Sequence, residues 1–486
     1  MIAWMLTALL AGTPLVEAVR QQDAGAVRAL LAARVDVNAP EGDGTTALHW
    51  AVHAERLEIV QALIDNGARV EVANDLGITP LYLSASTGNH TLVALLLKHG
   101  ANPKVAAPSG VTALMAASRT GSVETVKQLL AAGAEVNARE RARGQTALMW
   151  AAARGHAAVV QTLLEHGADV HARSAARSVT VMLDRGPRRA VKTSMQDARV
   201  IGQGGNTALL MAAQAGSADS VRLLLAAKAT PNDTAADGNS ALVIAAFSGH
   251  DAVAAALLEA GADCNAAGAG YTALHAAALR GDLATVKALI ARGADLERPI
   301  TQGSPVRRFG SQWALPSTLA GATPLMVAAA YLETDIMKTL LQAGARATTS
   351  LADGTSALLV AAGVAVEKEA RPSDLARWNI VDSDTPVVPR AEPDVLAAVS
   401  MLLDAGAQIA DVSLATGDTA LHGAAGENHP AVIQRLVEHG AALHARNKDG
   451  QTPLQLTLPR PPQGRFSGAP GLPAAEAMLR KLGAIE

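Results

Sequence analysis

Aromatic side chains are scarce in this sequence of 486 residues, in which Phe, Trp and Tyr together make up 2%. Hydrophobic residues nevertheless make up 49%, so the core must consist mainly of small and aliphatic side chains, which suit thin, closely spaced helices. The single cysteine, Cys264, excludes an intrachain disulfide, so the fold does not depend on an oxidising compartment. A chain this apolar, with a net charge of −3, is not intrinsically disordered. Its glycines and prolines lack the three-residue period of collagen.

Neither sign of charge dominates, since 41 basic residues face 44 acidic ones. This balance excludes a whole-molecule attraction to nucleic acid or to an anionic membrane, and leaves only local patches for such binding. The longest uncharged stretch, residues 309–332, is interrupted by Gly and Pro, so no transmembrane helix is expected. Arg greatly outnumbers Lys, which is typical of a GC-rich bacterial genome.

The first twelve residues form an apolar segment that resembles the hydrophobic region of a secretory signal but has no basic residue before it. We interpret residues 1–12 either as a truncated leader or as an N-terminal cap on the structured chain. The protein is accordingly expected to be cytoplasmic, or exported if the segment is a signal.

One short pattern, Thr or Ser followed by a small residue and Leu, recurs along the whole chain. Most successive copies are 32 to 34 residues apart, and the three longer gaps of 61, 51 and 63 are one period plus an insertion. The sequence therefore predicts twelve copies of one structural unit. The copies begin at Thr13, Thr46, Thr79, Thr112, Thr146, Thr207, Ser240, Thr272, Thr323, Ser356, Thr419 and Thr452.

Residues 143–173 illustrate the unit. Thr146 stands where a helix N-cap is needed, and apolar residues follow at helical spacing until Gly155, which is typical of a helix end. A second amphipathic segment runs from about His156 to Gly167 and leads into an extended tail. Each unit is thus predicted to be a helix, a turn, a second helix and a hairpin-like loop, whose apolar face is buried only by stacking on its neighbours.

The motifs Thr79-Pro80-Leu81, Thr46-Ala47-Leu48-His49, Thr272-Ala273-Leu274-His275 and Thr419-Ala420-Leu421-His422 resemble the TPLHxA signature of ankyrin repeats, whose period is ~33 residues. The resemblance implies an all-α ankyrin-repeat solenoid over residues 13–484. It also implies a non-enzymatic, monomeric scaffold that binds one or more proteins and needs no cofactor. The most frequent departures from the signature are Ala for Pro and an apolar residue for His.

Insertions interrupt the units near residues 174–203, 300–318, 366–392 and 459–473. The first two are expected in hairpin loops, and the last two between the helices of their own units. The first insertion is basic, which favours an acidic or phosphate-bearing partner, although a solvated loop explains the charge equally simply. Its candidate anion-binding residues are Arg185, Arg188, Arg189 and Lys192. An enzyme or effector site within the insertions, or nucleic-acid binding at the basic patch of residues 139–199, remains the alternative function.

In ankyrin repeats, partners contact the hairpin tips and the exposed ends of the first helices, which together line a concave face. On this sequence the resemblance places an arginine group and an apolar, aromatic group at such positions. Arginine beside exposed aromatics is typical of an interaction hot spot, but the aromatics could equally pack on neighbouring units or under an insertion. The partner-binding candidates are Arg119, Arg143, Arg154, Phe247, Tyr271, Leu279, Arg280 and Tyr331.

No catalytic or metal-binding motif is expected. Cys264 takes the place of a Val in sister units and is predicted to be a small, buried core residue. His166 and His439 share one position at the end of a second helix, where a His suits the helix dipole better than a metal site. Residues 202–205 are rich in Gly and precede a helix, but they close an insertion before an ordinary unit rather than follow the parallel strand that precedes a phosphate-binding loop. Trp50 and Trp150 occupy a slot that is Leu, Met or Ile elsewhere, which favours packing over partner contact.

Overall fold

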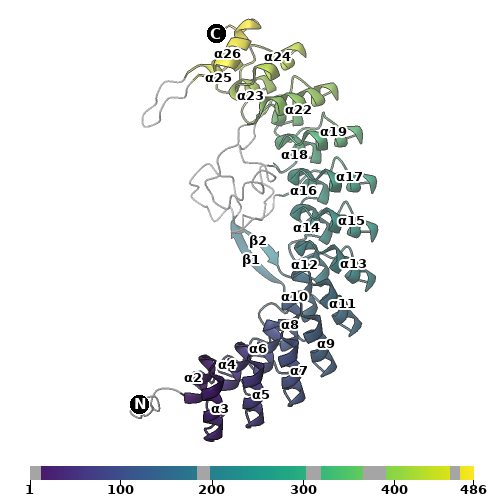
Figure 1. Cartoon of the computed structure of the whole chain (residues 1–486). Coiled ribbons are helices and arrows are strands. Elements are labelled where there is room, and N and C mark those ends of the chain that lie inside the picture. The colour runs from purple at the N-terminus through teal and green to yellow at the C-terminus, as the bar shows by residue number, and fades with distance from the viewer. Residues whose placement is uncertain (1–12, 183–197, 303–318, 365–389, 460–470, 486) are drawn as a thin grey trace. The chain divides into compact units, whose positions relative to one another are not determined.

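The computed structural model describes residues 13–182, 198–302, 319–364, 390–459 and 471–485. In this part of the chain the structure consists of short α-helices in consecutive pairs, with one pair of β-strands (Figure 1). The helices fall into two compact units. Unit 1 comprises residues 1–177 and 202–236, and unit 2 comprises residues 178–201 and 237–486.

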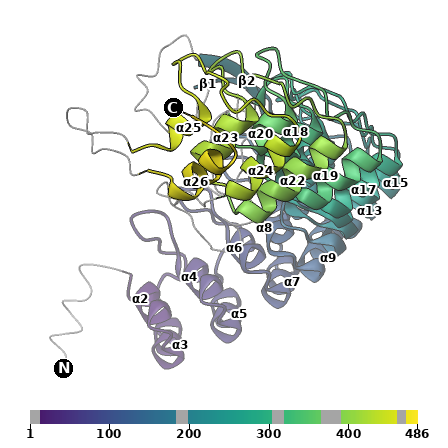
Figure 2. The same ribbon diagram turned by 90° about the horizontal axis from the view of Figure 1, so that it is seen from above.

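In unit 1 the first helices of successive pairs form one row and the second helices form a row beside it, as Figure 2 shows for α2 to α9. The first helices are α2 (Pro14–Arg20), α4 (Ala47–His53), α6 (Pro80–Thr87), α8 (Ala113–Thr120), α10 (Ala147–Ala153) and α12 (Ala208–Ala215). The second helices are α3 (Ala24–Ala32), α5 (Leu57–Asp65), α7 (His90–Lys98), α9 (Val123–Ala131), α11 (Ala157–Glu165) and α13 (Ala218–Ala226).

Unit 2 repeats this arrangement. Its first helices are α14 (Ala241–Ser248), α16 (Ala273–Arg280), α18 (Pro324–Ala330), α20 (Ala357–Ala361), α23 (Ala420–Gly426) and α25 (Pro453–Thr457). Its second helices are α15 (Asp251–Glu259), α17 (Leu283–Ala291), α19 (Thr334–Gln342), α22 (Glu392–Asp404), α24 (Pro430–Glu438) and α26 (Pro473–Lys481).

The recurring Thr or Ser begins a first helix in every copy of the pattern, as predicted, because each of these residues is a helix N-cap. In α10, for example, the Thr146 hydroxyl accepts a hydrogen bond from the Met149 amide at 3.4 Å. This bond satisfies one of the amides that a helix start leaves unpaired. The N-cap prediction is confirmed.

Small and aliphatic residues fill the core of each pair. In α10 the side chains of Leu148, Met149, Ala151 and Ala152 are at most 1% exposed. Within unit 1, α10 packs against both α8 and α12, and the alanines let these first helices approach closely. The scarcity of aromatic residues is thus a consequence of thin helical layers.

The first insertion lies between α11 and α12, that is, between two helix pairs, and its ends are ordered as strands. β1 (Arg177–Met182) pairs with β2 (Ala198–Gln203) in a two-stranded sheet. At the base of this pair, the Arg177 guanidinium donates hydrogen bonds to Gln203 Oε1 at 2.7 and 2.9 Å. Residues 174–203 therefore leave and rejoin the helical pairs through strands rather than through irregular loops.

The third and fourth insertions each fall between the two helices of one pair. α20 ends at Ala361 and α22 begins at Glu392, so the third insertion separates the two helices of one pair. α25 ends at Thr457 and α26 begins at Pro473, which places the proline-rich segment in the same way. The interiors of all four insertions and the apolar residues 1–12 lie outside the described residues.

Candidate protein-binding face

The candidate site is the face formed by the C-terminal ends of the first helices and the hairpin tips, here called the inner face. In unit 1 three of the predicted residues are exposed on it: Arg119 in α8, Arg143 in a tip and Arg154 directly after α10. No ion pair joins these arginines to a carboxylate in the described part of unit 1. They present unneutralised positive charge to solvent.

The backbone of Arg119 is fixed by the next helix pair. His156 Nε2 donates a hydrogen bond to the Arg119 carbonyl at 3.0 Å, which holds the end of α8 against the start of α11. Gly121 makes this contact possible, because its φ is +83° and a Cβ there would lie 2.8 Å from the His156 ring. Arg119 therefore projects from a rigid helix end.

In unit 2 the expectation of an exposed apolar and aromatic group is wrong for two residues. Tyr271 is 5% exposed and Leu279 is 1% exposed. The Tyr271 ring lies 6.1 Å from that of Phe247, and its hydroxyl donates to Asn239 Oδ1 at 3.1 Å in the neighbouring tip. Burial also raises the pKa of Tyr271. Packing on neighbouring pairs, the alternative considered from the sequence, describes these two side chains.

The remaining candidates in unit 2 are half-buried: Phe247, Arg280 and Tyr331. A Cβ on Gly249 would lie 3.0 Å from Arg280 Nη2, so the guanidinium lies against the glycine that ends the preceding first helix. Desolvation lowers the pKa of this guanidinium, while Asp282 opposes the change. These three residues are accessible in part only.

Several arginines of the predicted basic patch have structural partners. Arg173 pairs with Asp233 at 2.6 Å and donates to the carbonyls of Gly205 and Thr234 at 3.0 and 2.8 Å. Arg139 donates to the Arg173 carbonyl at 2.6 Å. These bonds tie the start of the first insertion to the tip before it and to the tips after it. The anion-binding candidates Arg185, Arg188, Arg189 and Lys192 lie outside the described residues.

The glycine-rich segment before α12 is explained by backbone packing. A Cβ at Gly202 would lie 2.1 Å from the Ala236 carbonyl oxygen, and one at Gly204 would lie 2.1 Å from that of Ala175. Only glycine allows the neighbouring backbones to come so close. The geometry therefore accounts for these glycines without an anion.

Histidines and the cysteine occupy structural positions. His166 and His439 donate from Nδ1 to carbonyls in the last turns of α11 and α24, at 2.8 and 2.9 Å. Cys264 is buried, as predicted, and burial raises the pKa of its thiol. Among the described residues, no three His, Cys, Asp or Glu side chains gather as metal ligands would.

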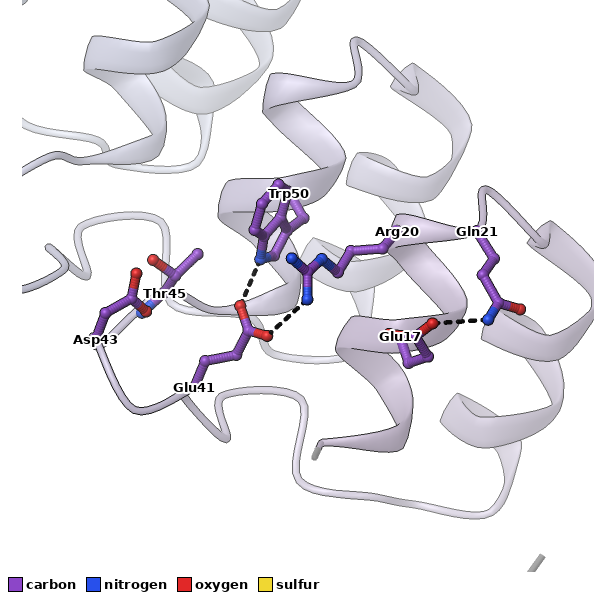
Figure 3. Close-up of polar contacts among 7 residues, drawn as sticks. All are labelled: Glu17, Arg20, Gln21, Glu41, Asp43, Thr45 and Trp50. Atoms are coloured by element: carbon purple, nitrogen blue, oxygen red, sulfur yellow. Dashed lines mark hydrogen bonds and ion pairs between the residues drawn. The ribbon is translucent and has the colours of Figure 1, made fainter. Parts of the chain in front are cut away.

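Sequence reasoning missed a polar cluster around Trp50, which is half-buried rather than fully packed. The Arg20 guanidinium lies 4.4 Å from the centroid of the Trp50 ring, within the range of a cation–π interaction. Glu41 joins the two, because its carboxylate accepts from Trp50 Nε1 at 2.7 Å and pairs with Arg20 at 3.2 Å (Figure 3). A hollow of about 360 Å³ opens beside this cluster. Its lining residues are Val19, Arg20, Gln22, Trp50, His53 and Ala54.

A second arginine lies over a tryptophan at the same register. Arg20 and Arg119 each follow their N-cap Thr by seven residues, and Trp50 and Trp150 follow theirs by four. The Arg119 guanidinium lies 5.6 Å from the Trp150 ring centroid. The recurrence of Arg and Trp at this spacing is the signal in the sequence that could have found both clusters.

Comparisons with known proteins agree with the geometry of the helix pairs. A family model described as ankyrin repeats in three copies matches residues 5–74, 67–140, 107–174 and 179–268. Further ankyrin models match residues 269–299 and 402–456. No curated protein matches the chain. None of the helices in the described ranges is long and apolar enough to cross a membrane.

One solved structure that resembles the chain is the human ASB11 ankyrin repeat domain. It is 26% identical, with a TM-score of 0.41, and the match covers 52% of this chain and 99% of that one. The family models, in contrast, match more than half of this chain. The chain therefore belongs to the ankyrin repeat family.

Proposed function

We propose that this chain is a non-enzymatic scaffold that binds one or more proteins through its inner face and hairpin tips. Ankyrin repeats are generally protein–protein interaction modules, and the family is typically non-enzymatic. The observation that carries the proposal is the exposure of Arg119, Arg143 and Arg154 on one face of unit 1, with no carboxylate of the described chain paired to them.

Arginine suits this role better than other exposed residues. Its planar guanidinium forms paired hydrogen bonds to carboxylates and stacks on aromatic rings, and arginine is enriched among residues that dominate binding energy. In unit 2, Phe247, Arg280 and Tyr331 are proposed as secondary contacts because they remain partly exposed. Tyr271 and Leu279 support their neighbours from within the core.

Charge reversal on the inner face tests the proposal. Proteins that copurify with the wild-type chain are identified by mass spectrometry, and the affinity of each is measured by calorimetry. The variant Arg143→Glu/Arg154→Glu should bind at least tenfold more weakly, because interface hot spots contribute more than ~1 kcal/mol each.

The matched control is Lys98→Glu/Lys127→Glu, which makes the same change in charge on the second helices α7 and α9. Both lysines are exposed. We expect this control to change affinity less than threefold. Equal losses in both variants, or no loss in the arginine variant, would contradict the proposed face.

A further inference from the structure

A carboxylate of the chain is bound at one of the two arginine–tryptophan pairs and is missing from the other in the described structure. At Trp50, Glu41 accepts the indole N–H and neutralises Arg20. At Trp150, the indole Nε1 is shielded from solvent and has no hydrogen-bond acceptor in the described structure. Arg119 likewise has no carboxylate partner there. A buried polar group without a partner costs free energy, so this site favours an added acceptor.

The tip before α10 does hold a glutamate at the position equivalent to Glu41, namely Glu140, but its carboxylate is bound to backbone amides of that tip. Glu41 and Glu140 each donate their amide to the carbonyl of the residue before the N-cap Thr. Glu140, however, is 6% exposed and turns into its own tip. Its carboxylate accepts from the amides of Ala142, Arg143 and Gln145 at 2.7, 2.8 and 3.0 Å.

We propose that a carboxylate of an acidic segment of a partner protein binds at Arg119 and Trp150, where it takes the position that Glu41 holds at Arg20 and Trp50. The carboxylate accepts from Trp150 Nε1 and pairs with the Arg119 guanidinium. The inference rests on the proposed function, because it assigns a chemistry to part of the inner face.

The charges around the site favour an acidic occupant. Arg141, Arg143 and Arg154 are exposed nearby in sequence, in the tip before α10 and at its end, and none forms an ion pair in the described chain. Trp150 Nε1 is shielded from solvent, so a carboxylate can reach it only when the atoms that cover it move. Hydrogen bonds between a guanidinium and a carboxylate are about twice as strong as neutral ones.

A peptide is favoured over nucleic acid because the positive patch is local. The whole chain has a net charge of −3, so it lacks the broad positive field that phosphate backbones require. The template inside the molecule is also a carboxylate, bound in one orientation by one indole and one guanidinium. The occupant is therefore expected to be an Asp or Glu side chain.

The test follows the indole N–H resonances of the full chain labelled with ¹⁵N-tryptophan. Resonances are assigned with Trp50→Phe and Trp150→Phe, and the probe is a peptide of ten glutamates. We expect a saturable shift of the Trp150 resonance and none of the Trp50 resonance. Arg119→Gln should weaken binding roughly tenfold, as expected for loss of a charged hydrogen bond. The matched control Arg20→Gln should leave it unchanged.

Removal of Glu41 should create a second binding site for the peptide, at Arg20 and Trp50. In Glu41→Ala, the Trp50 resonance should also respond to the glutamate peptide, because the internal carboxylate has been removed. Absence of a Trp150 shift in the wild type, an equal shift with a peptide of ten glutamines, or an unresponsive Trp50 in Glu41→Ala would each overturn the proposal. Tighter binding of a ten-nucleotide thymidine strand at Trp150 would overturn it in favour of phosphate.

These results are separable from the test of the proposed function. If the glutamate peptide does not bind while Arg143→Glu/Arg154→Glu still weakens the binding of a copurified protein, the carboxylate site is disproved and the proposed function stands. If the peptide binds but that variant leaves copurified proteins unaffected, the inner face is not where those proteins dock.

Discussion

The Trp50 and Trp150 clusters use the same register in two helix pairs of unit 1 but differ in how their polar groups are satisfied. At Trp50 the chain supplies Arg20 above the ring and Glu41 at the indole N–H. At Trp150 the arginine is present, whereas the glutamate bonds to the backbone of its own tip. A repeated scaffold thus holds one completed and one incomplete copy of a polar cluster.

The clusters also differ one residue earlier, at the third position of each helix. His49 precedes Trp50, and its Nδ1 accepts from the Thr46 amide at 3.1 Å while Nε2 donates to the Ile78 carbonyl at 3.0 Å. Met149 precedes Trp150 and is fully buried. Polar linkage between neighbouring pairs is therefore present at the first cluster and replaced by apolar packing at the second.

The largest expected loss of stability comes from removing the Glu140 side chain. This variant tests whether Glu140 stabilises its own tip, whereas Glu41 binds Arg20 and Trp50. In Glu140→Ala, three tip amides lose their acceptor, and we expect a loss of about 2–4 kcal/mol in the free energy of unfolding. Urea unfolding followed by circular dichroism measures the loss, and hydrogen exchange at the amides of residues 142, 143 and 145 localises it. Glu140→Gln is the control: it keeps one oxygen acceptor and should recover most of the stability. Unprotected wild-type amides at this tip would contradict the assignment.

The next largest effect is a loss of stability at low pH, caused by protonation of the histidines at the third position of some first helices. In unit 2, His275 repeats the arrangement of His49: Nδ1 accepts from the Thr272 amide, and Nε2 donates to the Ala322 carbonyl at 3.3 Å. Burial lowers the pKa of His275 to about 4, and it also lowers those of His49 and His422. Protonation would place a hydrogen on Nδ1 facing the Thr donors, so the neutral ring is the native form.

The stability that depends on neutral His275 is fully present above pH 6.5 and is lost as the pH falls toward 4, where the loss reaches about 3 kcal/mol. Urea midpoints at pH 7 and pH 4.5 measure it. His275→Met places at this position the residue that α10 has there, Met149, and should reduce the pH dependence. His49→Met should have the same effect in unit 1. If acid destabilises wild type and His275→Met equally, the histidine is not the cause.

Much of the fold could be predicted from the sequence because every repeat of about 33 residues follows the same local rules. The N-cap residues are set by the need of a helix start for a hydrogen-bond acceptor, and the recurring pattern located those of the first helices. The burial of Cys264 followed from comparison with its sister units. Contacts across an insertion were harder to predict, since residues 174–203 separate Arg173 in sequence from the carbonyls of Gly205 and Thr234 to which it donates.

The inner face was predicted only in part, because side chains at the same position of two repeats differ in exposure. Leu279 stands seven residues after its N-cap, as Arg119 does, yet it is buried while Arg119 is exposed. An apolar side chain gains about 2 kcal/mol by leaving water, whereas a guanidinium loses hydration. The chemical character of a side chain was therefore a better guide to its exposure than its position along the repeat.

Removal of Glu41 is the smallest of the three effects and tests whether the two clusters are equivalent. Glu41→Ala leaves the Trp50 N–H without its acceptor and Arg20 without its partner, and the side chains of Arg20 and Glu41 are 46% and 27% exposed. Water replaces much of what is lost at such exposure, so we expect about 1–2 kcal/mol of destabilisation. The same urea unfolding measures it, with Arg20→Gln as the comparison. Arg20→Gln removes the solvent-screened ion pair and the cation–π contact with Trp50 but keeps the indole hydrogen bond, so it should cost about 1 kcal/mol. If Glu41→Ala costs no stability, the indole hydrogen bond contributes nothing, and the unpaired N–H of Trp150 gives no preference for a carboxylate.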